Sequence, residues 1–179
     1  MKKEAFSVSI YQYKVQNWNT KKKQLLNLFH RFPHKRHDNV ITSFFDSKIK
    51  TNIISEEIEL FKRDVGLKIN LSPSNFWFQE YNQNMNHSVH NHGTGGFSSV
   101  CFIEYNKNYH KPTTFISPFE DHITGGLKEY IPDAEEGNII FFPSNLLHYA
   151  PVNLSNKSRI IMSFNLHAEG VENHDLNYH

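Results

Sequence analysis

The sequence predicts a mainly β fold, a barrel or sandwich with about two helices packed on one outer face. Three observations predict it. Aromatic residues make up 14% of the chain, which is typical of a β-rich core. Two early segments show helical spacing, whereas the rest divides into short runs rich in Val, Ile, Phe and Tyr, separated by turn residues. No repeat or linker divides the 179 residues, so we expect a single domain over 1–179.

The expected elements begin with a strand at 6–13 and a helix at 20–32. Leu and Phe recur along this helix at helical spacing, and Thr20 stands where an N-cap is expected. A second helix starts after Ser55 and ends before Gly66, a residue type that often closes helices. The remaining expected elements are strands near 75–82, 87–92, 97–105, 113–117, 138–143, 146–150 and 158–166, with a long rim loop within 106–130.

Composition and charge exclude several classes of function. Nineteen basic and eighteen acidic side chains give a formal charge of +1, so bulk charge does not indicate a nucleic-acid partner. The single cysteine, Cys101, cannot form an internal disulfide, lies in an apolar run and suits a reducing compartment. No apolar stretch approaches the roughly 18 residues that span a bilayer, and the amino terminus lacks the apolar core of a signal peptide. We therefore expect a cytoplasmic protein with no membrane partner.

A pair of histidines, His90 and His92, falls on one of the expected strands. Residues two apart on a strand point to the same face, so both imidazoles can converge on one point. Imidazole nitrogen is a good ligand for iron, zinc, nickel and copper. Two exposed histidines before the glycine-rich segment 93–96 are the alternative. His87 would face the opposite side of a regular strand, unless a bulge turns it to line the rim or support the site.

A third histidine and an arginine complete the set. His148 follows an apolar strand and a turn, and its imidazole is either satisfied in the core or a metal ligand. Arg159 heads the last expected strand, where alternation places Ser163 and Asn165 on the same face. An inward-facing arginine needs an anion, and this strand contains no acidic residue, so a bound carboxylate is its natural partner. An arginine at an exposed strand end is the alternative.

Taken together, these pieces resemble the Fe(II)- and 2-oxoglutarate-dependent oxygenase superfamily, and within it a small prolyl-hydroxylase-like branch of bacterial and phage proteins. The resemblance covers about 65–165 of the sequence. The motifs that carry it are H-x-H at 90–92, GFSSVCFIEYN at 96–106, EGNIIFFPSNLLHYAPVN at 136–153 and RIIMSFN at 159–165.

The resemblance implies a double-stranded β-helix, a jelly-roll or cupin-like barrel with a metal near its open end. It implies that Arg159 binds the distal carboxylate of 2-oxoglutarate, and that Ser163 or Tyr81 adds a hydrogen bond. The implied activity is a hydroxylase-type dioxygenase reaction that uses Fe(II) and 2-oxoglutarate and needs no catalytic side chain beyond the metal centre. The implied iron ligands are His90, His92 and His148.

Two positions depart from the family pattern. The superfamily usually has a carboxylate where this chain has His92, so three neutral imidazoles leave the charge of the metal to be balanced by the co-substrate. Many relatives have a serine two residues after the arginine, where this chain has Ile161 and places its serine at Ser163. Contacts to the co-substrate are therefore expected to differ.

Two other hypotheses stay open on the sequence alone. One is a cupin-like three-histidine metalloprotein that does not use 2-oxoglutarate, in which Arg159 has no particular role. The other is a non-catalytic binding or structural barrel with a degenerate site, for which the replacement at His92 is the main support. The substrate could be a small molecule or a peptide, and an edge strand at the amino terminus could pair in a homodimer.

Overall fold

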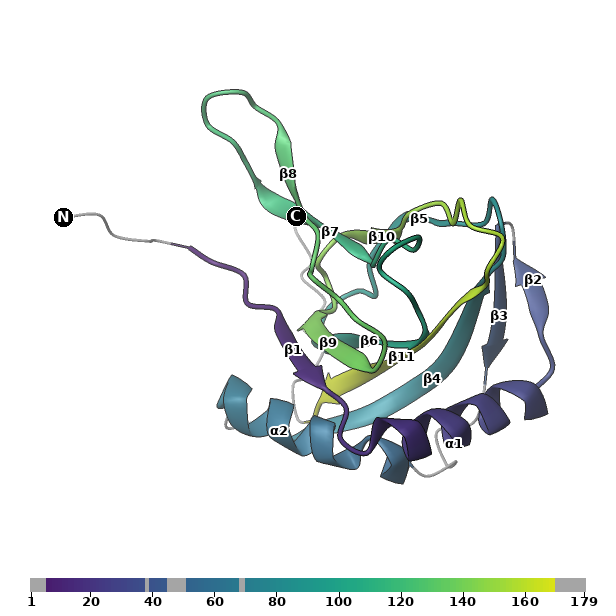
Figure 1. The fold of residues 1–179 in the computed structure, drawn as a ribbon. Coiled ribbons are helices and arrows are strands. Elements are labelled where there is room, and N and C mark those ends of the chain that lie inside the picture. The colour runs from purple at the N-terminus through teal and green to yellow at the C-terminus, as the bar shows by residue number, and fades with distance from the viewer. Residues whose placement is uncertain (1–5, 38, 45–50, 68–69, 170–179) are drawn as a thin grey trace.

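The structure is a computed structural model that describes residues 6–37, 39–44, 51–67 and 70–169. Strands dominate it, as Figure 1 shows. Its elements are β1 (Tyr11–Lys14), α1 (Trp18–Arg31), β2 (Lys35–His37), β3 (Val40–Phe44), the 3-10 turn η1 (Thr51–Ile53), α2 (Ser55–Val65), β4 (Leu71–Tyr81), β5 (His87–His90), β6 (Gly96–Glu104), β7 (Thr114–Glu120), β8 (Leu127–Tyr130), β9 (Asn138–Pro143), β10 (His148–Ala150) and β11 (Arg159–Ala168).

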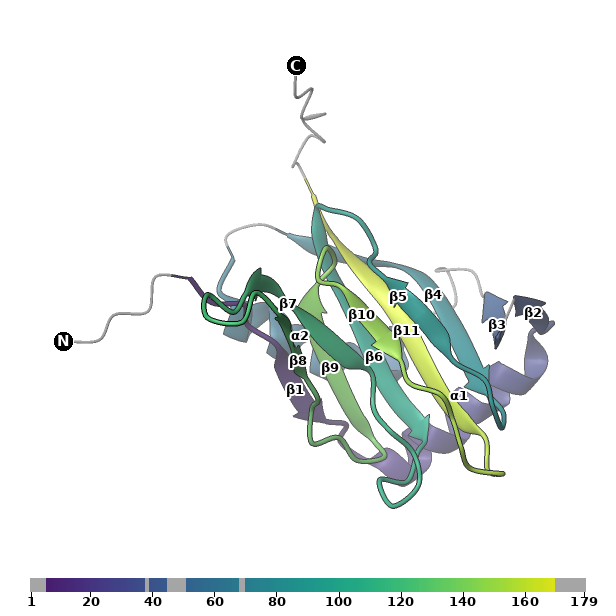
Figure 2. The ribbon, with the colours of Figure 1, turned by 90° about the horizontal axis from the view of Figure 1, so that it is seen from above.

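The strands form two antiparallel sheets that face each other (Figure 2). The larger has the order β1-β9-β6-β11-β4-β3-β2, and the smaller has the order β5-β10-β7-β8. From β4 onward the chain crosses repeatedly between the sheets: β4, β6, β9 and β11 lie in the larger one, and the strands between them lie in the smaller one. This winding is a double-stranded β-helix, so the predicted fold class is confirmed.

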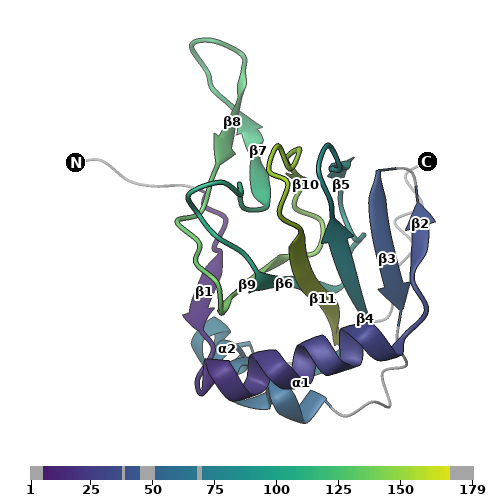
Figure 3. The same ribbon diagram turned by 45° about the vertical axis from the view of Figure 1, so that its right-hand side comes forward.

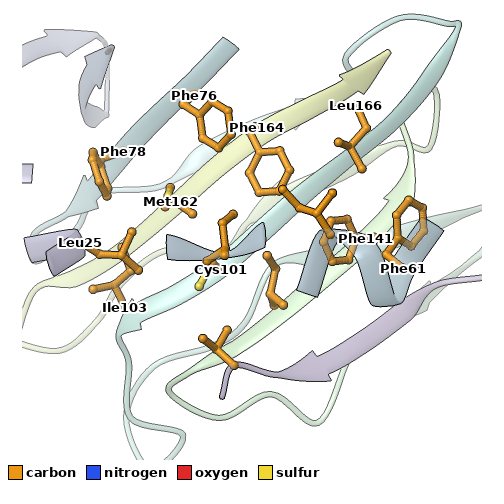
Figure 4. Close-up of a cluster of buried hydrophobic side chains, with 14 of the residues drawn as sticks. Leu25, Phe61, Phe76, Phe78, Cys101, Ile103, Phe141, Met162, Phe164 and Leu166 are labelled. Atoms are coloured by element: carbon orange, nitrogen blue, oxygen red, sulfur yellow. The ribbon is translucent and has the colours of Figure 1, made fainter. Parts of the chain in front are cut away.

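Both helices cover the outer face of the larger sheet, where Figures 1 and 3 show α1 and α2 crossing its strands. Their apolar stripes and the outward side chains of the sheet form one buried cluster (Figure 4). Phe61 of α2 stacks on Phe141 of β9 with ring centroids 4.4 Å apart. The strand β11 contributes Ile160, Met162, Phe164 and Leu166 to this cluster. Burial of these side chains from water fixes which face of β11 is left for the interior of the barrel.

A second buried cluster fills the space between the sheets. It contains Phe102, Phe142 and Ile161 from the larger sheet and Phe115 from the smaller one. The central strands β6 and β9 therefore bury side chains on both faces, which explains why their sequences are almost continuously apolar. The site described below lies at one end of this interior.

Most expected elements are found, with some corrections. Gly66 closes α2 in the left-handed conformation (φ 64°), and its N–H donates to the carbonyl of Lys62, as predicted. The prediction of Thr20 as an N-cap was wrong, because α1 begins at Trp18 after a left-handed Asn17 (φ 52°). Three strands, β2, β3 and β8, were not predicted. Much of the expected rim loop is the β7–β8 hairpin, which projects from the barrel in Figure 3. No helix in the described part of the chain is long and apolar enough to cross a membrane.

Candidate metal centre

Three histidines from two neighbouring strands converge on one point between the sheets. His90 ends β5, His92 follows two residues later, and His148 begins β10 directly opposite His90 in the antiparallel pair. One ring nitrogen from each lies within 4.8 Å of those of the others. The Nε2 atoms of His92 and His148 are 3.2 Å apart. The arrangement can hold one metal ion with three imidazole ligands.

Backbone carbonyl groups fix the orientation of two of these rings. Nδ1 of His90 lies 2.7 Å from the carbonyl oxygen of Ser88, and Nδ1 of His148 lies 2.9 Å from that of Leu146. A carbonyl oxygen only accepts, so in both neutral rings Nδ1 carries the proton and Nε2 keeps its lone pair. Hydrogen bonding at the far nitrogen is the usual way in which a protein orients a histidine ligand. Both rings therefore present a basic nitrogen to the point of convergence.

The position of His92 is set by the turn between β9 and β10. Its backbone N–H donates to the carbonyl of Ser144 over 2.8 Å. The Ser144 hydroxyl lies 2.9 Å from that of Ser98, which donates to Asn165 on β11. These buried hydrogen bonds connect the turn to the polar face of β11. They thereby help to fix the position of His92 in the metal centre.

Burial keeps the three histidines uncharged. It lowers the pKa of His148 to about 3 and that of His92 to about 4, and the neighbouring histidines contribute to both shifts. Burial also lowers the pKa of His90. Neutral imidazole is the form that binds metals, so the site is ready to bind a cation at neutral pH without first losing protons.

A fourth histidine, His87, lies beside this cluster. It opposes Ala150 on β10 while His90 opposes His148, so four residues of β5 match three of β10 and the strand bulges. The bulge brings the rings of His87 and His90 to the same side, with centroids 4.0 Å apart. Of the two alternatives for His87, the regular strand is therefore excluded, and the bulge that turns its ring toward the site is the one observed.

The histidines line a narrow pocket with about 20 Å³ of free space, which is room for a metal ion or a water molecule. Tyr81 and Ser163 lie in its wall, as does Ile161 at the position where many relatives have a serine. Among the residues that the structure describes, no aspartate or glutamate lines it. The full lining is Trp77, Gln79, Tyr81, His87, His90, His92, Ser99, Val100, Thr113, Phe142, His148, Tyr149, Ala150, Ile161 and Ser163.

Arg159 lies behind Tyr81, outside the wall of the pocket. Only 2% of its surface is exposed, and its guanidinium stacks on the Tyr81 ring, 4.3 Å from the centroid. It donates to the backbone carbonyls of Lys111 and Pro151. No described carboxylate pairs with it, and its Nε is buried without a hydrogen-bond partner. A buried guanidinium with an unsatisfied N–H fits the prediction of an anion-binding arginine.

One feature of the pocket was missed from the sequence. Gln79 lies in the wall, accepts a hydrogen bond from the Tyr81 hydroxyl at 3.0 Å, and approaches Nδ1 of His87 to 3.2 Å. Its position two residues before Tyr81 on the same strand face is the signal that could have found it. Outside the pocket, His110 in the expected rim loop is buried, and its ring contacts the backbone of Asn106 and Lys157. It therefore holds loops together away from the metal centre.

A double-stranded β-helix with convergent histidine ligands between its sheets defines the class of non-haem metal oxygenases and cupin-like proteins. Comparisons with known proteins narrow the class. A family model described as "Putative 2OG-Fe(II) oxygenase" matches residues 75–165, about half of the chain. No curated protein matches.

Solved structures match over most of the chain at very low sequence identity. A 2OG-Fe(II) oxygenase-family oxidoreductase from Burkholderia pseudomallei has a TM-score of 0.70 at 10% identity, covering 88% of this chain and 84% of its own. HygX from Streptomyces hygroscopicus, with nickel, 2-oxoglutarate and hygromycin B bound, has a TM-score of 0.67 at 7% identity, covering 91% and 84%. A Trichoplax adhaerens prolyl hydroxylase, in complex with a hypoxia inducible factor peptide fragment, has a TM-score of 0.63 at 11% identity, covering 89% and 84%.

The chain belongs to the 2OG-Fe(II) oxygenase family. It is an oxygenase that uses Fe(II) and 2-oxoglutarate, as the resemblance in its motifs predicted. The donor set fits a divalent iron, because three neutral imidazoles converge on one point. The unpaired buried guanidinium of Arg159 fits a dicarboxylate co-substrate.

Proposed function

We propose that the chain is a hydroxylase-type dioxygenase whose iron is held by His90, His92 and His148. Arg159 binds the distal carboxylate of 2-oxoglutarate, assisted by Tyr81 or Ser163. The observation that carries this proposal is the pairing of three neutral, convergent imidazoles with a buried guanidinium that has no acidic partner among the described residues. When bound, iron and 2-oxoglutarate supply the oxidative decarboxylation that drives hydroxylation of the substrate.

The residues of the chain orient the reactants and keep water away. The carbonyl groups of Ser88 and Leu146 hold the rings of His90 and His148, so the ligand nitrogens need little reorganisation to bind. The guanidinium of Arg159 donates two hydrogen bonds to backbone carbonyls. Its Nε–H, which has no partner among the described residues, offers the first contact for a carboxylate. The Phe142 and Ile161 side chains give the pocket apolar walls.

The substrate is a small molecule or a peptide side chain that enters through the mouth of this pocket. Similar structures hold hygromycin B in one case and a peptide fragment in another. We propose that the protein acts in the cytoplasm, in keeping with its single buried cysteine.

Succinate release tests the proposal. Purified protein is incubated in air with Fe(II), ascorbate and 2-oxoglutarate, and succinate is measured without added substrate, where slow uncoupled turnover is expected. His148→Ala should abolish it, and Arg159→Lys should raise the 2-oxoglutarate concentration needed by about tenfold or more, because lysine loses bidentate geometry. His122→Ala is the matched control, since His122 is exposed. Equal succinate release from wild type and His148→Ala would contradict the proposed ligand set.

A further inference from the structure

The charges around the candidate metal centre do not balance. Three neutral imidazole ligands add nothing to the two positive charges of the metal, and buried Arg159 adds a third. Among the described residues, no carboxylate lines the pocket or pairs with Arg159. 2-Oxoglutarate brings two negative charges, so one positive charge is left. An uncompensated charge in a buried site costs several kcal/mol, so a further anion is expected.

One carboxylate that contacts the pocket wall, that of Glu129, does not supply this charge. Glu129 accepts a hydrogen bond from the Tyr149 hydroxyl at 2.9 Å, but it lies on the exposed strand β8. A solvated carboxylate at the rim is screened by water and salt. The missing negative charge therefore has to come from a bound molecule.

His87 offers a hydrogen-bond donor beside the metal centre. The Gln79 carbonyl oxygen accepts from the Tyr81 hydroxyl, so the amide group of Gln79 turns its NH₂ toward Nδ1 of His87. Nδ1 of His87 is then the acceptor, and its Nε2 carries the proton. In the described part of the chain, no group accepts from this Nε2–H. The bulge in β5 places the His87 ring in the pocket wall, against His90.

From the residual charge and this free donor, we infer that the substrate carries a carboxylate that binds beside the metal centre and accepts a hydrogen bond from His87. The inference rests on the proposed function, because the charge count needs both the metal and 2-oxoglutarate. His87 is a positioning residue here: it places the acid group of the substrate and leaves the three ligand positions to His90, His92 and His148.

Acetate and acetamide, which have the same shape and differ in charge, test this inference. The Co(II) form of the protein is saturated with 2-oxoglutarate, and the paramagnetic relaxation of the methyl protons of each probe is measured by NMR, with the Zn(II) form as blank. Acetate should show saturable relaxation and acetamide should not. His92→Asp supplies a negative charge and should weaken acetate binding by about tenfold while 2-oxoglutarate still binds.

Two variants isolate the role of His87. His87→Phe keeps a ring but removes the donor, and should weaken acetate binding by about tenfold. His87→Gln keeps a hydrogen-bond donor and should retain most of the acetate binding. If acetate behaves as acetamide does, or if neither His87→Phe nor His92→Asp changes its binding, the inference is overturned. If chloride competes as well as acetate, a free inorganic anion fills the place and the carboxylate assignment is overturned.

The same samples separate this inference from the proposed function. Binding of Co(II) and of 2-oxoglutarate is followed by the visible spectrum before any probe is added. Loss of either binding step overturns the proposed function and the inference together. Normal binding of both, with no difference between acetate and acetamide, overturns the inference alone.

Discussion

Arg159 and Tyr81 lie directly opposite each other on β11 and β4, with the guanidinium 4.3 Å from the centre of the phenol ring. This cation–π contact supplies part of the stabilisation that an acidic partner would otherwise give. It also connects Arg159 to the pocket wall, because the Tyr81 hydroxyl donates to Gln79, which reaches His87. Arg159 and the metal centre therefore share one buried network.

Two substitutions of Tyr81 should separate the contribution of its hydrogen bond from that of its cation–π contact with Arg159. Tyr81→Phe keeps the ring over Arg159 and loses one buried hydrogen bond, so it should lower the free energy of unfolding by about 1 kcal/mol. Tyr81→Ala also loses packing and the cation–π contact, and should cost about 3–5 kcal/mol. Urea denaturation of both variants measures the difference. Equal losses would contradict a stabilising stack between the two side chains.

Acid should destabilise the metal-free protein before most carboxylates titrate. The pKa of His148 is lowered from 6.5 to about 3, so between these values the unfolded chain binds a proton that the folded chain does not. Stability is then full above pH 6.5 and falls as the pH is lowered toward 3. This effect of His148 alone should lower the free energy of unfolding by about 3 kcal/mol between pH 6.5 and about 4.5.

Thermal unfolding from pH 7 to pH 4 measures this effect, with His148→Phe as the matched variant that cannot protonate. The wild type should lose stability more steeply than the variant. Parallel curves would show that His148 does not titrate in the folded protein at an unusually low pH.

Divalent metal should stabilise the folded chain through its three histidines. A ligand that binds only the folded state at 100 times its dissociation constant adds about 2.7 kcal/mol. Zn(II) or Co(II) should therefore raise the melting temperature of the wild type, and His92→Ala should abolish most of this shift. His167→Ala is the control, since His167 is exposed. An unchanged shift in His92→Ala would place the bound metal elsewhere.

Gly137 should be intolerant of any side chain. It has a φ of 81°, and a Cβ added there would lie 2.8 Å from the Trp18 ring at the start of α1. Gly137→Ala would combine backbone strain with displacement of Trp18, and should cost about 2–4 kcal/mol. Because Gly137 is remote from the histidines, the metal affinity of the variant should stay at the wild-type value. A chemical denaturation curve and a metal titration on the same variant check both parts.

Periodicity predicted the parts of the site that lie on regular strands. Alternation along β11 correctly placed Ser163 and Asn165 on the buried inner face that Arg159 heads, since the opposite face packs against the helices. Local pattern could not predict the position of His87, because the bulge in β5 depends on its register with β10. The strands β2 and β3 were missed for a similar reason: β3 pairs with β4, far along the chain, and β2 is an edge strand that pairs with β3.

Iron and 2-oxoglutarate should bind together, iron at the three histidines and 2-oxoglutarate at Arg159. The most direct measurement is an anaerobic titration of the Fe(II)-loaded protein with 2-oxoglutarate, following the weak visible charge-transfer band of the chelate. We expect a saturable band in the wild type and in His122→Ala, no band in His148→Ala, and a band only at higher 2-oxoglutarate in Arg159→Lys. Iron binding without any band in the wild type would contradict this expectation.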